Sequence, residues 1–401
     1  MPCARLVGSR PSMVRRLAAR PRPVARARPV ARALMALLLL VGLLGGCDDA
    51  AAPPASRAGY AGLGRDADAY ARVMRGRPLV FPADHGPHDG YRIEWWYVTA
   101  DLKDEDGHDW GVQWTLFRSA LRPGAEQAGW DSPNAWMAHA ALTDASAHQF
   151  AEKFARGGIG QAGVIVRAPA DARHPSVSGA ETVSSQASAM PPPSFNAWID
   201  DWSLRGPDFD HLTMQASGKD FRYSLDLTAD GPLVLHGDGG YSEKSGQGQA
   251  SYYYSQPFYR VNGEVERAGK VHRVQGRAWL DREWSSQPLS ADQRGWDWFS
   301  LHLASGAKVM LFQVRQANGE PYRAGTWIDA DGRATVLRGD QVRLEALAWS
   351  RQDDGRQVPT RWRVRIAGVT GGEAAGDVNG EVDITVDALQ PKAWMGTSFP
   401  Y

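Results

Sequence analysis

The sequence is poor in cysteine, which limits its chemistry. Its 401 residues include two cysteines, Cys3 and Cys47. Because Cys3 lies in a region that resembles a cleaved leader, the mature chain can form no internal disulfide and no cysteine-based metal site. The HExxH metalloprotease motif, the GxSxG hydrolase motif and the phosphate-binding GxxxxGK[ST] loop are also missing. Three common enzyme classes therefore lose their usual sequence signature.

Acidic residues are missing from the first 47 residues, which contain nine arginines. An apolar run covers residues 33–44, too short for a membrane-spanning helix of ~20 apolar residues. Two glycines and Cys47 follow, and Leu44 to Cys47 resembles a bacterial lipobox. We expect a signal peptide over residues 1–47, a lipid on Cys47 and a flexible tether over residues 48–77. The alternatives are an uncleaved anchor and a cysteine that stands at this position by chance. The lipobox predicts a membrane-anchored, periplasm-facing protein of the bacterial cell envelope.

Without the leader, the chain has 36 basic and 45 acidic side chains. This acidic excess argues against general nucleic-acid binding, because neutralising phosphates requires surplus lysine and arginine. Apolar residues make up 43% and charged residues 22% of the sequence, which excludes a disordered chain. The length suits two domains.

Most of the remaining sequence has the pattern of short β-strands. Residues 91–102 and 110–118 alternate aromatic or β-branched residues with smaller ones around a polar turn, which predicts a hairpin. Short helices are expected only at residues 68–75 and 149–155, and residues 157–194 read as long loops with two weak strands. Four further strands are predicted at residues 138–143, 197–204, 212–217 and 221–228. The pattern indicates an all-β sandwich or barrel.

An internal similarity suggests that the β pattern occurs twice. The predicted hairpin from Trp95 to Arg118 has a counterpart from Trp296 to Arg315, with a leading tryptophan pair and a closing Phe and Arg. The body would then consist of two related β domains.

Three carboxylates set among aromatic residues are candidate catalytic acids: Glu94, Asp281 and Glu283. On a strand, Asp281 and Glu283 share one face with Trp279. Burial against apolar rings in a barrel lumen would raise the pKa of such a carboxyl and let it donate a proton near neutral pH. The alternative is a solvated face or rim ion pairs that include Arg282.

Two histidines and the sixteen tryptophans allow similar alternatives. His139, in an apolar strand, and His236, before Asp238, are either ligand-binding or structural. Residues 84–89 contain two Asp and two His without a metal-ligand spacing, so no metal and no cofactor are expected. The tryptophans either form a core or line a cavity for a flat apolar molecule. The expected ligand-binding residues are Trp95, Trp96, Trp114, His139, His236, Tyr253, Trp284, Trp296 and Trp298.

Six ordered motifs resemble the AttH-like, lipocalin-like secreted proteins, which are often called predicted secreted hydrolases and are related to the carotenoid 1,2-hydratases. The motifs are Phe81–Gly86, Glu94–Tyr97, His236–Asp238, Ala250–Ser255, Trp279–Trp284 and Gly295–Ser300. The resemblance implies two consecutive lipocalin-like (calycin) antiparallel β-barrels. We place them at residues 78–255 and 256–401.

The hydratase acid and base residues are not matched. The related hydratases have a His two residues before a Trp, and a Tyr/Asp pair in the next hairpin. Here Arg282 stands in place of that His and the hairpin contains Leu311, Phe312 and Gln313, whereas Trp284 is retained. Relatives also continue beyond Tyr401, so we expect the second barrel to be truncated.

The sequence therefore predicts an exported lipoprotein that binds an apolar isoprenoid or lipid-like ligand. One alternative is a hydratase-like lyase or a hydrolase that acts on such a molecule, using Asp281 or Glu283. Another, implied by the resemblance alone, is an accessory protein of an envelope ABC transporter permease.

Overall fold

The computed structural model describes residues 67–167, 194–287, 292–369, 377–378 and 381–398. The predicted leader, Cys47 and the first part of the predicted tether lie outside these residues. The described chain is all-β apart from four 3-10 turns, Ala67–Ala69, Ala83–His85, Gly129–Asp131 and Gly339–Gln341. Within it, no helix has the length and apolar character needed to cross a membrane. The predicted fold class is confirmed.

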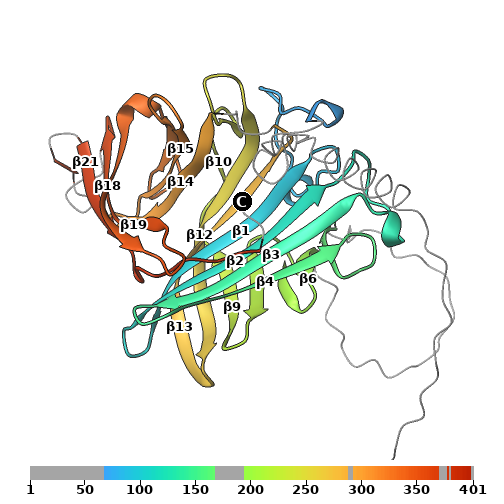
Figure 1. The fold of residues 1–401 in the computed structure, drawn as a ribbon, viewed down its shortest axis with the longest axis horizontal. Helices are drawn as coiled ribbons and strands as arrows, with labels where there is room; N and C mark the ends of the chain where they lie inside the picture. The colour runs from blue at the N-terminus through green and yellow to red at the C-terminus, as the bar shows by residue number, and fades with distance from the viewer. Residues whose placement is uncertain (1–66, 168–193, 288–291, 370–376, 379–380, 399–401) are drawn as a thin grey trace, which may run out of the picture. The chain divides into compact units, whose positions relative to one another are not determined.

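The first sheet is antiparallel and forms a nearly closed barrel (Figure 1). Its path runs β4-β3-β2-β1-β13-β12-β9-β8-β7-β6-β5, and two short strands, β10 and β11, pair with β12. The strands are β1 (Ile93–Asp104), β2 (Asp109–Ala120), β3 (Asn134–Asp144), β4 (His148–Arg156), β5 (Ala162–Val166), β6 (Phe195–Ile199), β7 (Trp202–Gly206), β8 (His211–Ser217), β9 (Phe221–Ala229), β10 (Val234–Leu235), β11 (Tyr241–Glu243), β12 (Ala250–Arg267) and β13 (Lys270–Ser285). We call this part the barrel domain.

Side chains of the barrel domain alternate between the lumen and the outer face, as the pleat of a strand requires. On β1, Trp96 and Val98 belong to the lumen core, whereas Tyr97 faces outward and contacts Trp298. On β13, Trp284 points into the lumen and Trp279 points outward. This alternation decides on which side of the sheet each candidate residue lies.

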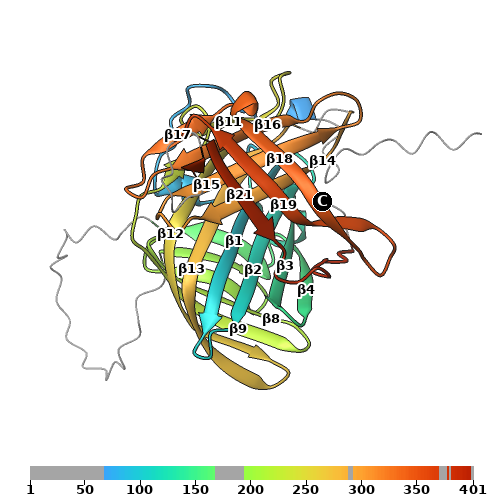
Figure 2. The ribbon, with the colours of Figure 1, turned by 90° about the vertical axis from the view of Figure 1, so that its left-hand side faces the viewer.

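The second part consists of two four-stranded antiparallel sheets that enclose one apolar core (Figure 2). We call it the second β domain. One sheet contains β14 (Gln293–His302), β15 (Lys308–Gln316), β16 (Tyr322–Ile328) and β17 (Ala334–Leu337), and the other contains β18 (Val342–Arg351), β19 (Gln357–Ala367), β20 (Asp377–Val378) and β21 (Glu381–Asp387). The two predicted Trp-led hairpins are both present, as β1–β2 and β14–β15.

A separate apolar cluster joins the outer faces of the two domains. It contains Tyr253 and Trp279 from the barrel domain, and Met310 and Phe312 from β15. The fold thus creates a second interior, between the domains, in addition to the barrel lumen.

The local structure differs from the sequence predictions in three places. Residues 149–155, expected to be helical, lie in β4, where Ala151 and Ala155 pack on the barrel core. The predicted strand 197–204 is two strands, because the chain turns at Asp200, whose φ is 50°. The predicted helix at 68–75 is limited to Ala67–Ala69.

The chain near the predicted domain limits also belongs to the barrel domain. Tyr70 and Val73, in the predicted tether, are buried. The predicted boundary at 255/256 falls inside β12, and the first sheet continues to Ser285. The long hairpin β12–β13 completes the barrel by pairing with β9 and β1.

Candidate functional site

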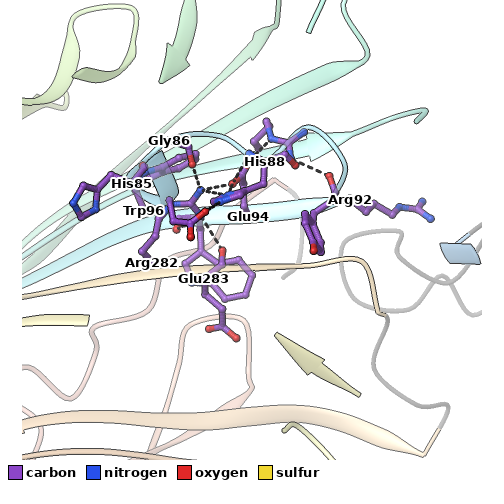
Figure 3. Close-up of polar contacts among 12 residues, drawn as sticks. His85, Gly86, His88, Arg92, Glu94, Trp96, Arg282 and Glu283 are labelled. Carbon is purple, nitrogen blue, oxygen red and sulfur yellow. Dashed lines mark hydrogen bonds and ion pairs between the residues drawn. The ribbon is translucent and has the colours of Figure 1, made fainter. Parts of the chain in front are cut away.

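The first candidate acid, Glu94, is fully buried and lies in an ion cluster at one end of the lumen (Figure 3). Glu94 on β1 and Arg118 on β2 are cross-strand neighbours that both point inward. Arg118 and Arg282, the latter from β13, each donate to the Glu94 carboxylate, and the His88 backbone N–H donates at 2.9 Å. We call these four residues the Glu94 cluster.

The Glu94 cluster keeps its carboxylate ionised. Burial alone would raise the pKa of Glu94, but the charges of Arg118 and Arg282 and the hydrogen bond from His88 outweigh burial and hold the pKa well below its ordinary value. The prediction that Glu94 has the raised pKa of a catalytic acid is therefore wrong. The reason is that two guanidinium groups, rather than only aromatic rings, surround this carboxylate.

The partners of Glu94 are themselves fixed. His88 lies between two carboxylates, with Nε2 2.9 Å from Asp84 and Nδ1 3.1 Å from Glu94, and its ring stacks on Trp284 at 3.9 Å. The Arg282 guanidinium lies 3.8 Å from the centre of a Trp96 ring. The cluster ties residues 84–88 to the barrel end, as a structural ion pair would.

The second candidate acid, Asp281, lies between the two domains rather than in the lumen. Its strand position points outward, so the expectation of a lumen site is wrong for Asp281 and Glu283. Ser255 on β12 and the Trp279 indole both donate to Asp281 Oδ1, the latter at 2.7 Å. The expected shared face of Trp279 and Asp281 is confirmed.

Asp281 begins a hydrogen-bonded chain that crosses the domain interface. Ser255 Oγ lies 2.6 Å from His236 Nε2, and His236 Nδ1 lies 2.9 Å from Thr326 Oγ1 on β16. Because the Ser255 hydroxyl donates to Asp281, it accepts from the His236 Nε2–H, and Nδ1 accepts from Thr326. When Asp281 is protonated, the same hydrogen bonds form with the donor and acceptor of each bond exchanged. We call these four residues the Asp281 relay.

The relay is buried and carries little charge. Burial raises the pKa of Asp281 to about 7, although hydrogen bonds from Ser255, Trp279 and Tyr253 partly oppose this rise. Burial and the charge of Lys244 lower the pKa of His236 to about 3, so this imidazole is neutral at neutral pH. The raised pKa expected for Asp281 agrees with this environment.

Glu283, the third candidate acid, lies beside the relay with other partners. It accepts a hydrogen bond from Ser251 at 2.5 Å and forms an ion pair with Lys244 at 2.9 Å. The Lys244 ammonium also lies over the rings of Tyr253 and Phe312. Glu283 is thus half of a nearly buried ion pair.

A groove of about 710 Å³ opens next to the relay. Gly237 and Gly325, which line it, directly follow and precede the relay residues His236 and Thr326. The lining comes from the segment around β11 and from β15, β16 and β17. Its apolar and aromatic members are Tyr241, Met310, Phe312, Pro321, Tyr322, Ala324, Val336 and Leu337, and its charged members are Arg75, Asp238, Glu243, Glu320, Arg323 and Arg338.

The nine expected ligand-binding residues do not form one site. Trp96, Trp114 and Trp284 belong to the lumen core. His236, Tyr253 and Trp298 lie at the domain interface, where the Trp298 indole donates to the Tyr253 hydroxyl at 3.0 Å. The other three are Trp95, His139 and Trp296. The rings of Trp95 and His139 both lie near the ring of Phe117, that of Trp95 at 6.3 Å, and Trp296 is partly exposed.

One group of described residues brings three metal-type ligand atoms within 4.8 Å of one another: Asp104, Asp106 and His108. Asp104 already accepts hydrogen bonds from the backbone N–H groups of residues 106 and 108 and from the Trp110 indole. Asp106 and His108 are exposed. These bonds explain the cluster as a tight turn, and we assign it no metal.

The sequence did not predict most partners of Glu94 in the Glu94 cluster or of Asp281 in the Asp281 relay. Arg118 shares the inward parity of Trp114 in an apolar strand, and this was a usable signal, because a buried arginine needs a carboxylate opposite. Ser255 and Thr326 are small polar residues in ordinary strand contexts, so nothing in the sequence marks them. The groove residues belong to two domains and meet only in the fold.

With this geometry in place, the comparisons with known proteins identify the family. The AttH-like family profile matches residues 72–401. The chain belongs to the AttH-like family. A crystal structure described as an AttH from Nitrosomonas europaea is 32% identical, with a TM-score of 0.60, over 73% of this chain and 83% of that chain. Kievitone hydratase from Nectria haematococca is 11% identical, with a TM-score of 0.48, over 75% and 82%. The search of curated proteins gave no match.

Proposed function

We propose that this AttH-like protein is an exported lipoprotein of the bacterial cell envelope, anchored through Cys47 and facing the periplasm, that binds an uncharged, flat, isoprenoid-like molecule. The binding site is the groove between the two domains. The observation that carries the proposal is the aromatic lining of the groove. The groove has a volume of about 710 Å³, which falls in the range of small-molecule sites, roughly 300–1,000 Å³.

The charges around the groove favour an uncharged ligand. Three arginines and three carboxylates line it. Arg75 pairs with both Asp238 and Glu243, at 2.7 and 2.6 Å, and Arg323 lies 3.6 Å from Glu320. An anionic ligand would have to compete with these carboxylates for the guanidinium groups, and it would pay desolvation to do so.

Titration of the full chain with retinol and retinoic acid tests the proposal. Both probes are flat and conjugated, but only the acid is anionic at neutral pH. Quenching of tryptophan fluorescence should saturate with retinol, and retinoate should bind at least about tenfold more weakly, about 1.4 kcal/mol. If neither retinol nor any other neutral isoprenoid gives a saturable response, the proposal is wrong.

A groove-filling substitution locates the ligand. Val336 lines the groove and is 50% exposed, so Val336→Trp should fill the groove without disturbing the core. It should weaken retinol binding at least about tenfold. Leu347→Trp on the outer face of β18 is the matched control, since Leu347 is 46% exposed and lies outside the groove lining.

A second candidate function is a hydratase-like reaction on the same ligand, favoured by the Asp281 relay beside the groove. In such a step the proton of Asp281 would reach one carbon of a double bond. Water oxygen would add to the other carbon, and a water proton would restore Asp281. Asp281→Asn should then abolish turnover and spare retinol affinity. Turnover that survives in Asp281→Asn would exclude this role.

The accessory role beside an envelope ABC transporter permease stays a prediction. Co-purification of a permease with the full chain from membranes would support it. A chain that is recovered alone after mild detergent extraction would count against it.

A further inference from the structure

Three large apolar side chains are exposed on two loops at one end of the barrel domain. Leu121 is 58%, Trp130 73% and Ile159 38% exposed. Leu121 and Trp130 belong to the β2–β3 loop, and Ile159 belongs to the β4–β5 loop. We call these three residues the apolar tip. Large apolar side chains exposed on neighbouring loops are candidates for a contact surface.

The two loops hold each other in place. The Gly129 N–H donates to the Gly158 carbonyl at 2.7 Å, and the Leu121 N–H donates to the Pro133 carbonyl at 2.7 Å. Gly158 has a φ of +77°, and a Cβ there would lie 2.3 Å from the Gln127 and Gly129 carbonyl oxygens. The close approach requires glycine, so the tip is presented on a defined support.

Two arginines donate hydrogen bonds to the loop that carries Trp130. Arg156 donates to the carbonyls of Trp130 and Ser132, and Arg122 donates to the Asp131 carbonyl. Guanidinium groups bound to the backbone of the loop that carries an exposed indole suit the boundary between lipid tails and phosphate groups, where tryptophan and arginine are both favoured.

The tip lies beside the segment that leads back to Cys47. The Tyr70 hydroxyl donates to the Ala120 carbonyl at 2.9 Å, directly before Leu121. About twenty residues separate Cys47 from Ala67, the first described residue. The lipid anchor of the proposed function would therefore be joined to this end of the barrel domain by a short stretch of chain.

We infer that Leu121, Trp130 and Ile159 insert into the interface of the membrane that carries the protein, so that the barrel domain docks on the bilayer by this end. The inference takes the lipid anchor from the proposed function. The occupant is a lipid surface, because Trp130 combines a large apolar ring with an N–H group that suits the headgroup region.

Quenching by brominated lipids tests the tip directly. The full chain is bound to vesicles of phosphatidylethanolamine and phosphatidylglycerol whose acyl chains carry bromine, which quenches tryptophans that lie in the bilayer. We expect quenching in the wild type, and Trp130→Phe should remove most of it. The double variant Leu121→Ser/Ile159→Ser keeps Trp130 and should reduce its quenching at least about twofold, because less apolar area holds the tip in lipid.

The matched control is Trp349→Phe, which removes another exposed tryptophan, on the outer face of β18. It should leave the quenching unchanged. Absent quenching, equal quenching in Trp130→Phe, or an equal loss in Trp349→Phe would each overturn the inference. The anchor is tested separately by the mass of the mature N-terminal peptide. An unmodified Cys47 would refute the anchor and leave the quenching comparison in place.

Discussion

Two buried carboxylates in this protein have opposite environments. Glu94, in the barrel lumen, is fully buried and bound by Arg118 and Arg282. Asp281, between the domains, is 2% exposed and bound by the Ser255 hydroxyl and the Trp279 indole. The first carboxylate faces two positive charges, and the second faces neutral donors.

This difference separates structure from potential chemistry. Removing one member of a buried ion pair leaves the others uncompensated, so the Glu94 cluster contributes to stability only as a complete set. Burial without a positive charge beside it raises the pKa of Asp281 to about 7, so this carboxyl gains or loses its proton near neutral pH, which is the property that acid–base catalysis requires. Position alone would have grouped the two residues, because both lie in aromatic-rich strands.

The largest effect is expected from breaking the Glu94 cluster. Glu94→Gln leaves two buried guanidinium groups without their carboxylate, and the free energy of unfolding should fall by about 3–5 kcal/mol. Urea denaturation followed by tryptophan fluorescence measures the change. The matched control is Asp387→Asn, which breaks the half-exposed Arg361–Asp387 pair and should cost less than about 1 kcal/mol. Equal losses in both variants would remove the distinction between the buried and exposed pairs.

A smaller effect, dependent on pH, is expected at Asp281. Its pKa is about 7 in the folded protein, above the ordinary value of 3.8. The folded protein therefore holds this proton where the unfolded chain has lost it, and the stability that this proton provides is lost as pH rises toward 7. Between about pH 5 and pH 8, the wild type should lose on the order of 2–3 kcal/mol relative to Asp281→Asn.

The Glu94 cluster has the opposite pH dependence. Its folded pKa lies below the ordinary value, so its contribution is present above about pH 4.5 and is lost as pH falls further. Denaturation curves of wild type and Asp281→Asn from pH 5 to pH 8 measure the Asp281 slope, and curves of wild type and Glu94→Gln below pH 4.5 measure the slope of the Glu94 cluster. A flat difference between the two proteins from pH 5 to pH 8 would contradict the assignment for Asp281.

A still smaller effect tests whether the relay couples the two domains. His236→Phe and Thr326→Val each remove one side of the 2.9 Å contact across the interface. A double-mutant cycle should give a coupling free energy of about 1 kcal/mol, as expected for a buried neutral hydrogen bond. Strictly additive losses would mean that the histidine and the threonine act independently.

The all-β class and the paired hairpins followed from the alternation of residues, because a strand's period of two is visible in the sequence. The pairing of Glu94 with Arg118 was also accessible, since a two-strand hairpin fixes which residues face each other. The Asp281 relay was not accessible. Ser255 and Thr326 are 71 positions apart, and only the packing of one domain on the other brings them to the same histidine.

The main error in predicting the candidate site concerned the face of the sheet on which Asp281 lies. Asp281 was expected in the lumen, but residues 280 and 282 occupy that face, so Asp281 points to the second domain. A single strand's pattern shows that two faces differ and does not show which face is inside when both are covered. Both faces of β13 are buried here near Trp279 and Trp284.

The most direct test of the proposed function compares retinol binding in two variants of the full chain. Val336→Trp fills the groove between the domains, and Trp114→Phe alters the barrel lumen. Fluorescence titration should show saturable binding in the wild type, at least about tenfold weaker binding in Val336→Trp, and little change in Trp114→Phe. Weaker binding in Trp114→Phe with unchanged binding in Val336→Trp would place the ligand in the lumen and contradict the assignment of the groove.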